Sequence, residues 1–395
     1  MTARWLLVAL ALVLAGGCGE KITLPEAEGI PVVSDYFDIT PGTLADEFEW
    51  VVDVELFGGT FAVCDSGSGR VVLIFDDGQI NRNREPIEGL ESPVALELEQ
   101  ERSLLLVVQG NAPGGYEVLG FDTRFELEFE EPLGPDVLSV SDVTSDGQFL
   151  YVGDPQARTV HRFAMAAAPG FGPLVRQGTM VAADPEQFDV FSPQVVSRPG
   201  GLATDAAGMI VVCDADTSRN WVLRYDPLAP PGSPEAAGSS VIFGPTREEL
   251  AAGASAFPPS VRCGDVFSIE ASTLGRAPSC DPEPDFQLGP RSEAGFFHSP
   301  AGVGIDGDGN LYVADRFNGR IQRFAPDGTF DSEFGRGLGS GDRELREPVR
   351  LAVWDGITNT NTGRVYIPGA HVAVVDASNG RLRIYDDSRW TPWAD

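Results

Sequence analysis

The sequence predicts an all-β fold made of several small antiparallel sheets, and three observations support this. Residues 300–324 contain three short apolar runs, separated by Asp306-Gly307-Asp308-Gly309 and by Asn318-Gly319. Gly, Asn and Asp at such positions supply the backbone conformations that tight hairpin turns need. Weaker copies of the pattern recur along the chain, which has 46 Gly and 30 Pro in 395 residues and no long helical periodicity. Short strands separated by frequent turn residues are typical of propellers, barrels and sandwiches.

Each element of the repeat follows from its residues. The expected strands in the clearest copy are Val303–Ile305, Leu311–Ala314 and Ile321–Phe324. An Asp ends the second strand in most copies, an Arg follows, and an aromatic residue closes the third strand in several of them. The Asp and Arg positions are Asp65 and Arg70, Asp154 and Arg158, Asp214 and Arg219, Asp315 and Arg320, and Asp376 and Arg381.

The Asp and Arg of each copy are expected to face each other across the hairpin, where the Arg also reaches turn carbonyls. An exposed pair of this kind contributes only about 0–1 kcal/mol. We therefore expect the pair to fix the geometry of the turn once per sheet. The alternative is that these charges form a ring of ligand contacts, because all of these turns should emerge on one face.

The clearest copy resembles an NHL repeat. The residues that carry the resemblance are Pro300-Ala301-Gly302-Val303, Tyr312-Val313-Ala314-Asp315 and Asn318 to Phe324. It is strong over residues 291–350, fair over 199–226 and 60–75, and faint elsewhere. The resemblance implies a six-bladed β-propeller of four-stranded antiparallel blades.

We assign residues 46–395 to this propeller and expect an irregular insertion at about 227–290, a proline-rich stretch that breaks the repeat. The alternative is a propeller of seven blades, with a degenerate blade within residues 260–269.

The N-terminus predicts a lipoprotein signal peptide over residues 1–17. Arg4 precedes an apolar run of eleven residues from Trp5 to Ala15, which is shorter than the about 20 residues that cross a bilayer. Ala15-Gly16-Gly17-Cys18 then resembles a bacterial lipobox, so Cys18 is the predicted lipidation site. The alternative is an ordinary secretory signal with an incidental Cys.

The predicted location is the outer membrane or the cell surface, on the periplasmic or extracellular side, with the lipid as the only membrane attachment. Residues 18–45 are read as a tether. They include a strand-like segment, Ile30 to Phe37, which is a candidate for the outer strand that closes the ring of the last blade.

The charge of the chain argues against nucleic-acid binding. It contains 28 Lys and Arg against 59 Asp and Glu, a net charge of −31, and such a surface repels phosphate backbones. Asp306 to Asn310 imitate the start of a calcium-binding EF-hand loop, but Leu311 and Phe317 stand where that loop needs Gly and Glu. We therefore interpret the segment as a hairpin turn; no cofactor is predicted, and calcium stays open.

The remaining cysteines fall into two groups. Cys64 and Cys213 occupy the same position of two repeats, so we expect them to be buried free thiols. Cys263 and Cys280 lie in the irregular stretch and are expected to form a disulfide in an oxidising compartment.

The residues that enzymes of related folds use are scarce here. Propeller enzymes such as the amidating lyase of peptide maturation resemble this family and hold zinc with several inward-facing histidines. This chain has only His161, His298 and His371, well separated in the sequence. We also find no Gly-x-Ser-x-Gly motif and no phosphate loop.

We therefore predict a non-enzymatic binding or scaffold module anchored in the cell envelope, whose partner is an unidentified envelope protein or extracellular ligand. Catalysis is left open: the alternative is a calcium-dependent hydrolase or lyase of the gluconolactonase-like or amidating-lyase-like type. The candidate binding face comprises Arg316, Phe317 and Asn318 on a turn, and His298 on the loop that approaches the next inner strand.

Overall fold

The structure of the protein is a computed structural model. The residues that it describes are 36–38, 47–111, 115–168, 170–182, 196, 198–216, 220–225, 227, 240–241, 295, 297–335, 337–341, 344–360 and 363–387. The predicted signal peptide, Cys18, Cys263, Cys280 and nearly all of residues 227–290 lie outside this part of the chain. Within it, no helix combines the length and the apolar character needed to cross a membrane.

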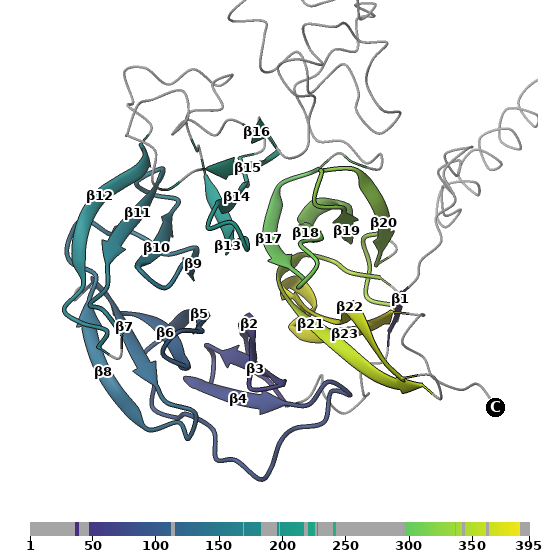
Figure 1. Cartoon of the computed structure of the whole chain (residues 1–395), viewed down its shortest axis with the longest axis horizontal. Helices are drawn as coiled ribbons and strands as arrows, with labels where there is room; N and C mark the ends of the chain where they lie inside the picture. The colour runs from purple at the N-terminus through teal and green to yellow at the C-terminus, as the bar shows by residue number, and fades with distance from the viewer. Residues whose placement is uncertain are drawn as a thin grey trace, which may run out of the picture. The chain divides into compact units, whose positions relative to one another are not determined.

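The prediction of an all-β propeller with six blades, not seven, is confirmed. Six antiparallel sheets surround one axis (Figure 1), and five of them have four strands while the first has three. The first three sheets are β2 (Val51–Phe57), β3 (Thr60–Asp65) and β4 (Arg70–Ile74); β5 (Pro93–Glu99), β6 (Leu104–Asn111), β7 (Gly115–Phe121) and β8 (Leu127–Pro132); and β9 (Asp142–Ser145), β10 (Phe149–Asp154), β11 (Thr159–Ala164) and β12 (Val175–Ala182).

The other three sheets follow the same order from the axis outward. They are β13 (Pro199–Thr204), β14 (Ile210–Asp214), β15 (Trp221–Tyr225) and β16 (Ser240–Val241); β17 (Pro300–Ile305), β18 (Leu311–Asp315), β19 (Arg320–Phe324) and β20 (Phe330–Phe334); and β21 (Pro348–Thr360), β22 (Gly363–Asp376), β23 (Arg381–Asp387) and β1 (Tyr36–Asp38).

The last blade combines both ends of the described chain. Strand β1 pairs antiparallel with β23, with Tyr36 opposite Asp387 and Asp38 opposite Tyr385. A segment from the start of the chain is therefore the outer strand of the sheet that the end of the chain builds. The pairing of β1 with β23 therefore holds the first and the last described strands of the chain in one sheet.

The first blade has no regular outer strand because its residues favour turns. The segment after β4 contains Asp76-Asp77-Gly78, Asn81 and Pro86, which are turn formers and strand breakers. Only isolated bridges, Ile74 with Ile80 and Val71 with Ile87, connect it to β4.

The hydrophobic core is divided among the contacts between blades. Six buried clusters each combine residues of two neighbouring sheets. The cluster that joins the first and last sheets, for example, packs Val54 and Val63 against Val375 and Ile384. Successive side chains of a strand point to opposite faces of the sheet. Middle strands such as β14 and β18 are buried at every position, so these sheets are buried on both faces.

Candidate functional site

The five repeat aspartates build one face of the propeller. All five are fully buried, with 0% exposure, and each ends the second strand of its blade. Each carboxylate accepts a backbone N–H from the loop that leads into the inner strand of the same blade. The donors are Trp50 to Asp65 at 2.9 Å, Leu138 to Asp154 at 2.7 Å, Arg198 to Asp214 at 2.9 Å, His298 to Asp315 at 2.7 Å, and Arg346 to Asp376 at 2.8 Å.

The expected partnership with Arg is present in three of the copies. Nε to Oδ2 distances are 3.2 Å for Arg70 and Asp65, 2.8 Å for Arg320 and Asp315, and 3.0 Å for Arg381 and Asp376. Each Asp thus holds both its own turn and the approach loop, a second role that the spacing of the residues did not reveal. In the third blade the buried ring of His161 lies 3.1 Å from Asp154, and Arg219 lies outside the described residues.

The structure brings the four predicted binding-face residues together. The rings of His298 and Phe317 meet edge to face at a centroid distance of 5.0 Å, and the Arg316 guanidinium lies 4.8 Å from the centre of the Phe317 ring. The Phe317 N–H donates to the carbonyl of His298 at 3.0 Å, and the Asn318 amide donates to Asp315 at 2.8 Å.

All four side chains are half-buried, so this stack of rings and charge is held in one arrangement. Arg316 also forms an ion pair with Glu347 at 2.9 Å. Partial burial lowers the pKa of His298, which favours the neutral imidazole next to Arg316. The cluster therefore presents an aromatic ring between an imidazole and a guanidinium, with a carboxylate beside them.

A second group of charged residues faces the central axis. Arg350 of β21 lies between Asp53 of β2 and Asp142 of β9, with Nε to Oδ1 distances of 3.8 and 3.7 Å. Its guanidinium also donates to the carbonyl of Ala301 at 3.1 Å and to that of Ser141. The inner strands of the first, third, fifth and sixth blades therefore meet at one arginine.

Two further acids, Glu55 and Glu97, belong to the same group. Glu97 accepts the backbone N–H of Ser145 at 2.7 Å and Glu55 that of Leu56 at 2.8 Å. Burial, supported by Asp53, raises the pKa of Glu55 to about 8. Burial and then the charge of Glu55 raise the pKa of Glu97 well above its usual value.

The two carboxyl groups beside Arg350 also bind protons more tightly than usual. Burial and Asp142 raise the pKa of Asp53 to about 7, although Arg350 opposes the shift, and burial raises the pKa of Asp142 against the same opposition. None of these acids stands out in the sequence as a candidate site residue. The only signal was the alternation of Asp53 and Glu55, which places both on one face of β2 without telling which face meets the axis.

This group does not fit a calcium ion. Calcium takes about six to eight oxygen ligands, whereas Arg350 already stands between Asp53 and Asp142 and their oxygens accept backbone N–H groups of Val54, Leu96, Val143 and Leu202. Within the described residues, no group of three or more His, Cys, Asp or Glu side chains is placed to hold a metal ion. Cys64 and Cys213 are buried and free.

Comparison with known proteins identifies the repeat. Residues 297–324 match the NHL repeat family, and no curated protein matches the chain. A protein of unknown function from Bacteroides thetaiotaomicron is similar in structure, with a TM-score of 0.54, 14% identity, and coverage of 89% of this chain and 75% of that one.

Two solved enzyme structures are also similar, with lower scores. A gluconolactonase from Xanthomonas campestris has a TM-score of 0.47 and 10% identity, with 89% of each chain covered. A catalytically inactive virginiamycin B lyase from Staphylococcus aureus has a TM-score of 0.43 and 10% identity, with 85% of this chain and 80% of that one covered. At 14% identity, the likeness to the Bacteroides thetaiotaomicron protein shows a common fold only.

Proposed function

We propose that the protein is a lipid-anchored envelope protein whose propeller is a non-enzymatic module. This module binds a partner through the face built by the five aspartate-anchored turns, which we call the turn face. One observation carries the proposal: each turn and its approach loop are fixed to one another through a fully buried carboxylate. Loops held on a rigid scaffold are where binding residues usually lie. Lipid attachment at Cys18 would place this face in the envelope.

The stack of His298, Phe317 and Arg316 is the strongest anchor that we find on this face. Aromatic and arginine side chains contribute most to protein interfaces, and side chains that are already ordered lose little conformational entropy when a partner binds. The proposed partner is therefore a protein or another extracellular ligand with a site for an aromatic ring and a guanidinium. The strong negative charge of the chain disfavours nucleic acid.

Site-specific crosslinking tests this proposal. A photoreactive benzoyl-phenylalanine replaces Phe317 in the cells that make the protein, and a matched probe replaces Asp327, which is exposed on the turn between β19 and β20. That turn lies at the opposite end of the blade. We expect a defined adduct from position 317 that is absent from position 327, and weaker adduct formation when Arg316→Ala is added.

Equal adducts at positions 317 and 327, or none at 317 while the protein remains in the membrane, would refute the turn face as the binding site. A companion variant, Phe317→Ala, should lower partner capture while the free energy of unfolding changes by no more than about 1 kcal/mol. A larger loss of stability would assign Phe317 a structural role instead.

One observation favours the alternative function, a hydrolase or lyase acting at the axis. Glu55 and Glu97 are carboxyl groups with raised pKa values near other acids, and such groups are typical of acid–base sites. Purified protein tested on lactones and esters separates the two functions. Turnover that Glu55→Gln abolishes would support the enzyme, and turnover that this variant retains would come from a contaminant.

A further inference from the structure

A pocket lies between the first and second blades, on the face opposite the aspartate-anchored turns. Strand β2 begins at the face of the aspartate-anchored turns, where Val51 pairs with Asp65. It ends at the opposite face, where Phe57 pairs with Thr60. The pocket is at this second end and has a volume of about 460 Å³. Pockets of about 300–1,000 Å³ hold most small-molecule ligands.

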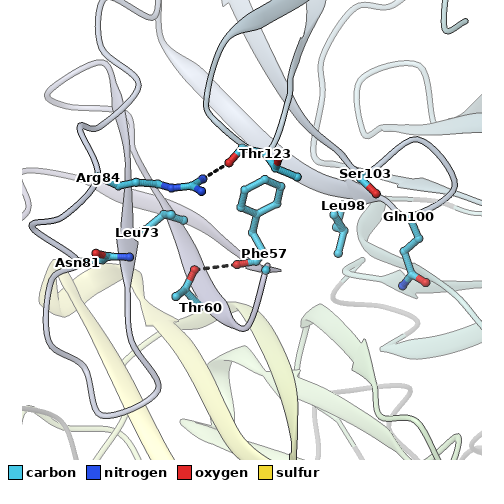
Figure 2. Close-up of a pocket in the computed structure, with 10 residues that line it drawn as sticks. Phe57, Thr60, Leu73, Asn81, Arg84, Leu98, Gln100, Ser103 and Thr123 are labelled. Carbon is cyan, nitrogen blue, oxygen red and sulfur yellow. Dashed lines mark hydrogen bonds between the residues drawn. The ribbon is translucent and has the colours of Figure 1, made fainter. Parts of the chain in front are cut away.

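The floor of the pocket is apolar. Phe57, Leu73 and Leu98 line it, from β2, β4 and β5 respectively, and Figure 2 shows the Phe57 ring between Leu73 and Leu98. The same ring stacks on Phe125 of the turn between β7 and β8, at a centroid distance of 5.6 Å. Phe57 and Leu73 are almost fully buried, with 3% and 5% exposure, while Leu98 is half-buried. An apolar group of a ligand would therefore contact mainly Leu98 and the edges of the two buried side chains.

The rim is polar and carries a positive charge. Asn81 and Arg84 come from the irregular loop after β4, while Gln100 and Thr123 come from turns of the second blade. Arg84 lies 5.5 Å from the centre of the Phe125 ring. Figure 2 shows that it donates to the carbonyl of Thr123. None of the ten residues that line the pocket is an Asp or Glu.

The setting of Arg84 indicates the charge of the ligand. Two residues earlier, Arg82 is paired with Glu47 at 3.1 Å. In the described part of the chain, Arg84 instead contacts a carbonyl and an aromatic ring, and no carboxylate pairs with it. Arg84 is exposed at the rim of the pocket. In a chain with 59 acidic residues and 28 basic ones, a guanidinium without an acidic partner is available to pair with an anionic group of a ligand.

We propose that this pocket binds a small organic anion that combines an apolar body with one carboxylate or sulfonate group. The apolar body lies against Leu98 and the edges of Phe57 and Leu73, and the anion pairs with Arg84. The hydroxyl and amide groups of the rim accept or donate hydrogen bonds to the polar end of the ligand. This site is separate from the turn face and from the axial acids, so it gives the propeller a second ligand.

Calorimetric titration of the full-length protein in mild detergent tests the proposal. The probes are naphthalene-2-sulfonate and its neutral counterpart naphthalene-2-sulfonamide, each corrected by a titration into detergent alone. We expect the sulfonate to bind at one site per chain. Arg84→Gln should weaken its binding at least about tenfold, because a charge-assisted hydrogen bond is lost.

The controls separate charge from packing. Arg82→Gln, two residues away and already paired with Glu47, should leave sulfonate binding unchanged, and Arg84→Gln should change sulfonamide binding less than about twofold. The proposal is overturned if the sulfonate does not bind, if Arg82→Gln weakens it as much as Arg84→Gln does, or if both probes respond equally to Arg84→Gln. None of these outcomes depends on the function proposed for the turn face.

Discussion

Replacement of Asp315 by Ala tests whether the repeat aspartates hold the turn face together. The carboxylate is completely buried and accepts four hydrogen bonds: from the His298 backbone at 2.7 Å, Asn318 at 2.8 Å, Arg320 at 2.8 Å and Gln322 at 3.1 Å. Truncation removes the acceptor that these donors share, and with it the carboxylate link between the approach loop and the turn. Breaking a buried ion pair costs about 3–5 kcal/mol.

The expected loss lies at the lower end of that range. Arg320 keeps its ion pair with Glu333 at 2.7 Å, so its charge is still balanced after the truncation. The cost is then mainly that of the unsatisfied donors, at about 1–3 kcal/mol for each group that stays buried. We expect Asp315→Ala to reduce the free energy of unfolding by about 3 kcal/mol.

Urea titration followed by tryptophan fluorescence measures this change, because the chain contains six Trp residues. Asp308→Ala is the matched control, since it removes an exposed carboxylate from a turn of the same blade and should change the free energy by less than about 0.5 kcal/mol. If Asp315→Ala costs less than about 1 kcal/mol, or no more than Phe317→Ala, the buried carboxylate does not hold the face together.

Four further predictions follow from particular groups. His161→Ala should lower the free energy of unfolding by about 2 kcal/mol in the same titration, because it removes a buried partner of Asp154. Asp53 and Glu55, with pKa values of about 7 and 8 against ordinary values of 3.8 and 4.5, bind protons that the unfolded chain has released, so stability should fall as the pH rises from about 5 to 8. Urea titrations across that range measure the slope, which the double variant Asp53→Asn/Glu55→Gln should flatten. Mass spectrometry of membrane-extracted protein should find the diacylglyceryl group on Cys18, and an unmodified Cys18 thiol in a soluble form would contradict it. A non-reducing peptide map should link the remaining pair, Cys263 and Cys280.

The turns of the propeller could be predicted because their residues determine the local backbone. Gly309 and Gly319 have φ angles of +83° and +63°, the left-handed conformations that Asp-Gly and Asn-Gly turns require. The strands beside them are observed at Pro300–Ile305, Leu311–Asp315 and Arg320–Phe324. Each observed strand contains the expected one and extends it by a few residues at most.

The second blade shows why a motif search misses part of the repeat. Residues 94–130 lack the Asp and Arg, yet Gln109 stands opposite Pro93 as Asp315 stands opposite Pro300. Its amide oxygen accepts the backbone N–H of Glu91 at 2.8 Å, and its nitrogen donates to Glu117 at 2.6 Å. A neutral amide thus takes the place of the Asp and a carboxylate the place of the Arg, while the hydrogen bonds to the approach loop and across the hairpin are kept. Only the structure therefore reveals the equivalence.

The axial acids and the pocket could not be predicted from the sequence either, and here the reason is a different one. Both depend on which residues of separate blades come together: Arg350 and Asp53 are almost 300 positions apart, and the pocket joins β2 to turns near residues 100 and 123. Strand alternation divides side chains between two faces but does not tell which face is directed to the axis. Arg84 and Arg350 make these contacts only when the blades of the propeller pack against one another.

Arg350 also bears on where a partner can bind. A ligand that enters the axis at this level must displace a guanidinium that contacts the inner strands of three other blades. Its removal would leave Asp53 and Asp142 facing each other in a buried setting, where a second negative charge is costly. An entering ligand would therefore have to carry its own positive charge or bind while the acids are protonated.

Binding at the turn face requires neither, because the carboxylates there already accept hydrogen bonds and the aromatic and guanidinium groups reach the surface. The binding of a partner there leaves the electrostatics of the axis unchanged, and this favours the turn face over the axis as the binding site.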